Sequence, residues 1–204
     1  MFRQILSTAV VLLMTSGVPA WASAASDFRD PPRVQAAQGS TLQLFNAVQR
    51  RVLGYSQFTI FDSVQIRLDG GRVELTGKVT MPYKRTEIEK RVATVPGVVS
   101  VTNRIDVLPV SQFDDQLRFR IARAIYGNAT FWGYGSRANP PIHVIVEHGH
   151  VTLEGVVNSD VDRILARSIA SSFPTFGPVT NDLKTAAEAK VEPGPVNEQA
   201  EKDA

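Results

Sequence analysis

The chain of 204 residues contains no cysteine, and this absence excludes several kinds of protein. Without thiols there is no disulfide framework, no Cys-ligated zinc or iron–sulfur site, no thiol nucleophile, and no cysteine to carry a lipid anchor. An excess of charge of one sign is also missing, because 22 Lys and Arg face 20 Asp and Glu. A net charge of +2 gives no argument for nucleic acid as a partner.

Motifs of the common catalytic sites are missing too. The sequence has no G-x-S-x-G, no H-E-x-x-H, no calcium-binding EF-hand loop and no G-x-x-x-x-G-K-[ST] phosphate loop. The stretch from Gly71 to Lys78 has one residue too many for a phosphate loop, and it alternates like a strand. The sequence therefore predicts no catalytic residue, no cofactor and no enzyme.

The first 24 residues read as an export signal. Arg3 precedes an apolar run over residues 5–14, and small residues follow with cleavage patterns ending at Ala22 or Ala24. A membrane anchor needs about 18–20 apolar residues, and Gly17 and Pro19 interrupt this run, so cleavage is favoured over anchoring. The mature protein is then expected in the periplasm.

Two flanking segments are expected to lie outside the fold. Residues 25–40 contain Pro31-Pro32 and little periodicity, and they are interpreted as a flexible lead-in. Residues 186–204 have no aromatic residue and two large apolar ones, Val191 and Val196. Such a composition buries too little surface to offset the entropy of ordering, which predicts a disordered tail.

An internal repeat organises the rest of the chain. The segment 71–79 (GRVELTGKV) recurs as 149–157 (GHVTLEGVV), and ten of 33 gapless positions are identical between 71–103 and 149–181. Each copy predicts the order α-β-β-α-β: apolar residues spaced by four, an alternating hairpin, a second helix, and a last strand. The fold class is therefore α+β, with modules at 41–108 and 111–185, each a three-stranded mixed sheet covered by two helices. The very short linker at 109–111 predicts that the modules touch.

The repeated pattern resembles the BON domain family. The motif is G-x-V-x-L-x-G-x-V, a helix, and then V-P-G-V-x-x-V-x-N, and the second copy departs from it at Pro174-Thr175-Phe176. The positions with structural roles in this motif are Gly71, Gly77, Pro96, Gly97, Gly149, Gly155 and Pro174. The resemblance implies tandem periplasmic modules associated with phospholipid binding, envelope integrity and osmotic-stress response, and it carries over no catalytic residue or cofactor.

An insertion in the second module supplies the first candidate binding residues. Phe131, Trp132 and Tyr134 stand beside Arg137 and flexible glycines. Trp and Tyr favour the interfacial zone of a bilayer and also anchor protein interfaces. The alternative is that these rings fill the core edge or the seam between the modules.

Basic residues of the first module are the second candidates. That module has ten basic and six acidic residues, whereas the second has seven of each. The candidates are Arg50, Arg51, Lys84, Arg85, Lys90 and Arg91. On anionic lipid each surface cation contributes about 1 kcal/mol; the alternative is a solvated helix face.

Two further clusters favour ordinary structural roles. His143, His148 and His150 are interpreted as exposed hairpin residues rather than metal ligands, because the repeat does not reproduce them. Asp114 and Asp115 stand where a helix begins, which favours capping. The sequence thus predicts a non-catalytic envelope protein that binds anionic phospholipid surfaces, with a periplasmic protein-interaction or chaperone-like module as the alternative.

Overall fold

The structure is a computed structural model that describes residues 32–191, and it contains two modules in tandem. The predicted signal segment, residues 25–31 and residues 192–204 lie outside the described residues. The first module comprises α1 (Pro32–Leu53), β1 (Ser63–Asp69), β2 (Arg72–Val79), α2 (Pro82–Ala93) and β3 (Ser100–Val107). The second comprises α3 (Gln112–Tyr126), η1 (Ala129–Phe131), α4 (Trp132–Gly135), β4 (Ile142–Glu147), β5 (His150–Val157), α5 (Asp160–Ser171), β6 (Thr180–Thr185) and α6 (Glu188–Val191).

Both sheets have the predicted mixed topology, which confirms the α+β fold class. The strand orders are β1-β2-β3 and β4-β5-β6, so the second strand of each hairpin is central. The central strand pairs antiparallel with its hairpin partner and parallel with the last strand. The helix between the two parallel strands provides the crossover that such a pairing requires.

Each module has its own apolar core between its sheet and its helices. In the first, Val48 and Val52 of α1 meet Leu75 of β2 and Ile88 of α2, all buried. In the second, the equivalent layer is formed by Leu117, Ile121, Ile125, Val144, Leu153, Ala166 and Ala170. The helical spacing of four and the strand spacing of two therefore place one face of the long helices and of the strands on a core.

Two glycines of the repeat stand where a side chain cannot fit. Gly77 and Gly155 have φ angles of 119° and 121° in the central strands. A Cβ atom would lie 2.2 Å from the Ser63 carbonyl oxygen at Gly77 and 1.8 Å from the Pro141 carbonyl oxygen at Gly155. The backbone of the neighbouring strand thus approaches both positions closely.

The structure differs from the sequence-based expectations at three element ends. Helix α1 begins at Pro32, within the lead-in that was expected to be flexible, because proline is tolerated in a first helical turn and the segment is rich in Ala and Gln. The short helix α6 lies within the tail that was expected to be disordered. The sequence also favours Thr80 as the N-cap of α2, because Pro82 follows it in the first turn. In the structure the N-cap residue is Met81, and the Thr80 hydroxyl is engaged with Asp62 and Lys84.

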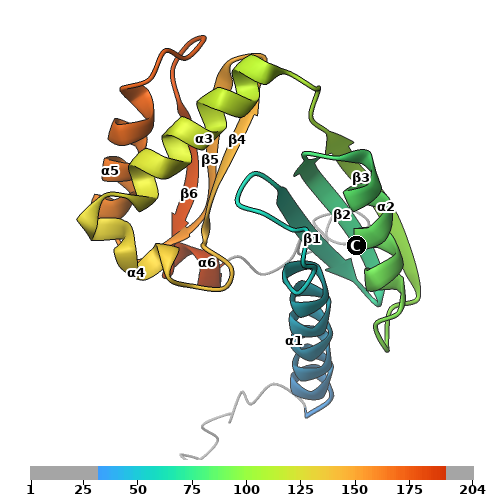
Figure 1. The fold of residues 1–204 in the computed structure, drawn as a ribbon. Coiled ribbons are helices and arrows are strands. Elements are labelled where there is room, and N and C mark those ends of the chain that lie inside the picture. The colour runs from blue at the N-terminus through green and yellow to red at the C-terminus, as the bar shows by residue number, and fades with distance from the viewer. Residues whose placement is uncertain (1–31, 192–204) are drawn as a thin grey trace, which may run out of the picture.

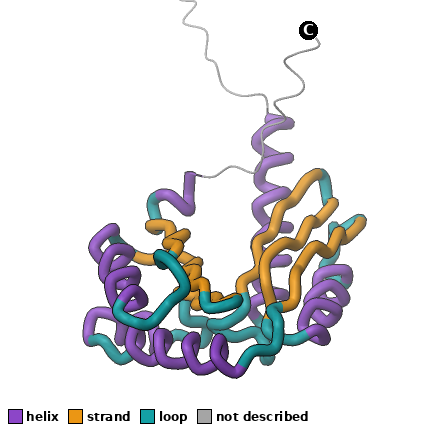
Figure 2. The backbone as a smooth tube through the Cα atoms, turned by 90° about the horizontal axis from the view of Figure 1, so that it is seen from above, coloured by secondary structure: helices purple, strands orange, loops and turns teal. Residues whose placement is uncertain are grey.

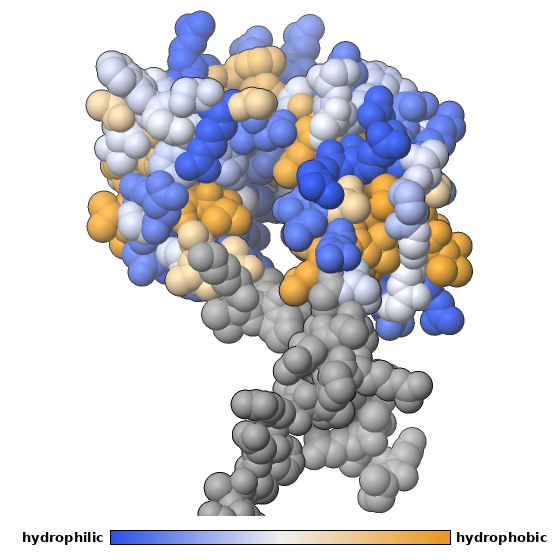
Figure 3. Space-filling view, turned by 90° about the horizontal axis from the view of Figure 1, so that it is seen from below, coloured by the Kyte–Doolittle hydropathy of each residue, from blue (hydrophilic) through white to orange (hydrophobic). Residues whose placement is uncertain are grey.

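The two modules stand side by side, and their sheets face the space between them (Figures 1 and 2). Helix α2 lies on the outer side of one sheet, and α3 and α5 lie on the outer side of the other. Seen from below, the surface is hollowed between the modules (Figure 3). Within residues 32–191, no helix has both the length and the apolar character needed to cross a membrane.

Candidate functional site

The seam between the modules is built by the loop that joins α1 to β1. The backbone N–H of Val144 in β4 donates to the carbonyl of Ile60 at 2.8 Å, so this loop pairs with the outer edge of the second sheet. The Phe61 ring packs edge-on against Phe119 of α3, with centroids 4.7 Å apart. The loop thereby covers part of an otherwise open sheet edge.

Polar contacts join the facing sheets deeper in the seam. The Ser63 hydroxyl donates to the Glu154 carboxylate at 2.5 Å, and the Gln65 amide lies 3.5 Å from the same oxygen. Lys78 of β2 forms an ion pair with Glu147 of β4. The short linker and these contacts agree with the prediction that the modules touch.

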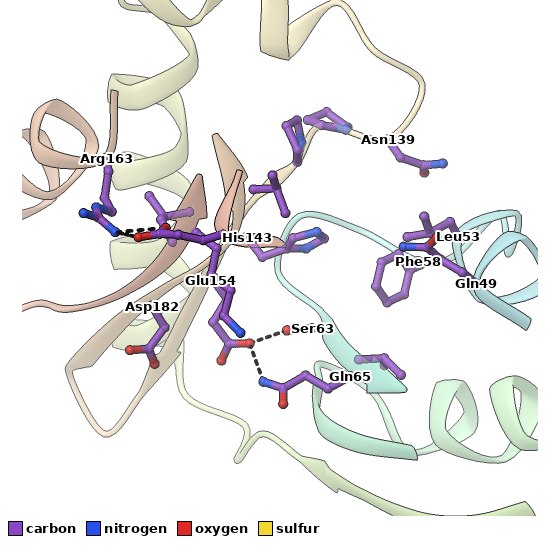
Figure 4. A pocket seen from close by; sticks show the side chains of 18 residues that line it. Gln49, Leu53, Phe58, Ser63, Gln65, Asn139, His143, Glu154, Arg163 and Asp182 are labelled. Atoms are coloured by element: carbon purple, nitrogen blue, oxygen red, sulfur yellow. Dashed lines mark hydrogen bonds and ion pairs between the residues drawn. The ribbon is translucent and has the colours of Figure 1, made fainter. Parts of the chain in front are cut away.

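A cavity of about 860 Å³ opens between the modules beside these contacts (Figure 4). The first module supplies Gln49 and Leu53 of α1, Phe58 of the loop, and the start of β1. The second module supplies Asn139, Pro140, Pro141, His143, Glu154, Arg163, Asp182 and Glu188 among others. The walls are thus mixed, with apolar, amide and charged side chains of both signs.

His143 projects from β4 into the seam rather than into solvent, which corrects the expectation that all three histidines are exposed (Figure 4). Its ring lies 5.7 Å from that of Phe58, and its Nδ1 atom is buried without a hydrogen-bond partner. Burial lowers the pKa of His143, and this effect outweighs the opposing influence of the Asp62 and Thr59 backbone and of nearby carboxylates. His148 and His150 are exposed as expected.

A buried ion pair fixes the loop between α1 and β1 to its own module. Lys84 Nζ lies 2.7 Å from the Asp62 carboxylate, and both side chains are almost fully buried. Thr59 and Thr80 each donate to that carboxylate through the backbone N–H and the hydroxyl. Burial alone would raise the pKa of Asp62, but the hydrogen bonds from Lys84, Thr80 and Thr59 hold it below its ordinary value. Lys84 is therefore a structural residue, which corrects its assignment to a surface for lipid.

The aromatic insertion of the second module is divided between core and surface. Phe131 and Tyr134 are buried in the core, whereas 68% of Trp132 is exposed. The Tyr134 hydroxyl donates to Asp162 and accepts from the backbone N–H of Asn158, both at 2.7 Å. Rings held this way cannot enter a bilayer without unfolding the insertion, so Trp132 is the one ring of the three that a partner can reach. Arg137 is exposed above the Tyr134 ring.

The remaining basic candidates lie on the helices of the first module. Arg50 and Arg51 are in the last turn of α1, and Lys90 and Arg91 are in the last turn of α2. The two turns are neighbours, because Arg51 lies 3.4 Å from the Thr94 hydroxyl and Arg91 covers the Tyr55 ring. We call Arg50, Arg51, Lys90 and Arg91 the basic cluster. Arg85 is exposed one turn earlier on α2. In Figure 1, α4 lies at the left in the second module, whereas α1 lies below the centre and α2 at the right, so the structure does not bring Trp132 and the cluster together.

Asp114 has a role that its place in the first turn of α3 did not predict. The N-cap of α3 is Ser111, whose hydroxyl accepts from the Asp114 backbone N–H. The buried Asp114 carboxylate instead accepts from the backbone N–H groups of His148 and Gly149, at 2.9 and 2.7 Å. It therefore fixes the β4–β5 turn. Among the described residues, no group of three or more His, Asp or Glu is placed to hold a metal ion.

Comparison with known proteins identifies the repeated unit. No curated protein matches the chain. Among solved structures, the C-terminal domain of CdsD, the structural protein of the type III secretion system of Chlamydia trachomatis, aligns over 72% of this chain and 66% of its own, with 15% identity and a TM-score of 0.28. A second CdsD structure aligns over 73% and 96% of the two chains, with 13% identity and a TM-score of 0.26. The model of the BON domain matches residues 47–109 and 114–187, in agreement with the repeat, and the chain therefore belongs to the BON domain family with two tandem copies.

Proposed function

We propose that this chain is an exported, non-catalytic protein of the cell envelope that attaches to anionic phospholipid surfaces through the basic cluster. Membership of the BON family supports an association with the envelope. The single observation that supports lipid as the partner is that the last turns of α1 and α2 are neighbours. They bring together Arg50, Arg51, Lys90 and Arg91.

Part of the charge of the cluster is available to a partner, since Arg91 is half-buried against the Tyr55 ring. Glu87 pairs with Lys90 at 3.1 Å, whereas Arg50 and Arg51 are exposed at the end of α1. Surface cations near an anionic leaflet contribute about 1 kcal/mol each, and their effect fades within a Debye length. Attachment of this kind is peripheral, reversible and sensitive to salt.

Vesicle co-sedimentation tests this proposal. The mature protein is expected to sediment with phosphatidylglycerol vesicles at low salt and not with phosphatidylcholine vesicles. The double variant Arg50→Gln, Arg51→Gln removes two cations, which should weaken binding by about 30-fold. A matched control, Arg123→Gln with Arg167→Gln, changes two exposed arginines on helices of the second module and should bind like the parent. No binding of the parent protein to anionic vesicles at low salt would refute the proposal.

A second candidate function is that of a protein-interaction module. It is favoured by exposed apolar residues on the second module: Trp132 is 68% exposed, Val161 71% and Ile164 66%. These residues are apart from the basic cluster, so the two functions can be separated by variants. Trp132→Ala should reduce capture of an envelope partner in this case and leave vesicle binding unchanged.

A further inference from the structure

We propose that His143 is a proton-operated latch between the two modules, closed when its imidazole is neutral and released when the imidazole is protonated. This inference concerns the seam and does not rest on the proposed binding to phospholipid, which uses a different surface. The His143 side chain projects from a strand of the second module and packs beside Phe58 in a loop of the first module.

In the closed seam the ring is largely withdrawn from water, and the backbone of Asp62 and Thr59 only partly favours a second proton on it. The imidazole packs beside Phe58, and the Nδ1 atom is buried without a partner. A proton added there would create a charge in a desolvated site, a cost that the backbone of Asp62 and Thr59 and the nearby carboxylates offset only in part. An open seam would let water solvate the same cation, so protons bind the open form more tightly.

The charged groups around His143 do not reverse this preference. Asp62 faces it from the loop, but that carboxylate already accepts five hydrogen bonds, from Lys84, Thr59 and Thr80. Glu154 faces it from β5 and is engaged by Ser63 and Gln65 of β1. Further along the same cavity lie Asp182 and Lys184 of β6, Arg163 of α5 and Glu188 of α6. Desolvation is the largest influence on the His143 pKa, and the pKa is lowered despite the carboxylates.

The sign and the size of the effect follow from proton linkage. The closed form binds fewer protons than the open one, so closure is fully favoured above the ordinary histidine pKa of about 6.5 and is weakened as the pH falls below it. If the closed form stays neutral, the ratio of open to closed molecules rises by up to about 30-fold between pH 7.5 and pH 5. Opening would expose Ile60 and Phe61 of the loop, which pack against the core of the second module.

Hydrogen exchange of one amide measures the opening directly. The Val144 N–H is bonded to the Ile60 carbonyl across the seam, so its protection factor reports the open population even when that population is small. Two amides serve as internal references: Val99, bonded to Gly71 within the first module, and Phe176, bonded to Gly149 within the second. Exchange is followed by NMR on the mature chain between pH 7.5 and pH 5, a range in which ordinary carboxylates stay ionised.

The expected result is a fall of up to about 30-fold in the Val144 protection factor, with the two reference amides unchanged. His143→Phe keeps a ring beside Phe58 but cannot bind a proton, and it should abolish the fall. The same change at the exposed histidine, His150→Phe, should leave the fall intact. His143→Leu replaces His143→Phe if circular dichroism shows that the latter is unfolded. A constant protection factor in the parent chain, or a fall that persists without His143, would overturn the latch.

Discussion

The hydroxyl of Tyr134 in the second module occupies the place that the carboxylate of Asp62 holds in the first. Asp62 accepts from the backbone N–H of Thr80 and from Lys84, while Tyr134 accepts from the N–H of Asn158 and donates to Asp162. Asn158 and Asp162 are Thr80 and Lys84 displaced by the repeat offset of 78. The two modules thus fasten the same junction between the central strand and the following helix, once with a buried ion pair and once with a neutral hydroxyl.

Loss of the cation of this junction should destabilise the first module strongly. Lys84→Met leaves the Asp62 carboxylate buried and unpaired, and breaking such a pair costs about 3–5 kcal/mol in the free energy of unfolding. Denaturant unfolding measures the change. The control is Arg85→Met, the adjacent exposed residue, which should change stability by less than about 0.5 kcal/mol. Equal effects of the two substitutions would contradict a buried structural pair.

The same carboxylate should make the first module sensitive to acid. The pKa of Asp62 is lowered on folding, so its contribution to stability is present above the unfolded value of about 3.9 and is lost as the pH falls toward the folded one. Denaturant midpoints between pH 6 and pH 3 should therefore drop more steeply for the parent than for Asp62→Asn. The variant is expected to be less stable at pH 6, with the gap closing toward pH 3. A gap that does not change with pH would argue against this linkage.

Removal of the Tyr134 hydroxyl should affect the second module more mildly. Tyr134→Phe leaves the Asn158 N–H without its acceptor and the Asp162 carboxylate without a donor, a loss of about 1–3 kcal/mol in the free energy of unfolding. Tyr83→Phe removes a hydroxyl from an exposed ring and serves as the control, with no measurable change expected. Unchanged unfolding of Tyr134→Phe would show that water replaces the hydroxyl at this junction.

The elements of both modules were predictable because they depend on local periodicity. Alternation by two and spacing by four place side chains on one face, and the second copy tested each assignment made in the first. The seam was not predictable in this way. Its apolar residues, Phe58, Ile60 and Phe61, lie in a loop, where no periodicity indicates which surface they will contact. The place of His143 along its strand likewise does not indicate that the other module covers it.

For two residues, Lys84 and Asp114, the sequence did contain a signal that indicates burial. Lys84 stands four residues before Ile88 and eight before Val92, on the apolar stripe of α2, so its burial followed from the helical period. Asp114 likewise precedes Leu117 by three and Ile121 by seven. Phe131, Trp132 and Tyr134 carried no such signal, because adjacent aromatic residues look alike in sequence whether they enter a core or face solvent.

Substitution of the strand glycines should show how closely the backbones approach. Gly155→Ala would place a methyl group 1.8 Å from the Pro141 carbonyl oxygen at a φ of 121°, a conformation that side chains rarely adopt. The clash is with backbone, which cannot rotate away, so the second module should lose several kcal/mol or fail to fold. Gly133→Ala is the matched control, since its added methyl group meets nothing within 4 Å in helix α4. Thermal unfolding followed by circular dichroism distinguishes the two, and a Gly155→Ala protein that melts like the parent would mean that β4 can move away from β5 at this position without cost.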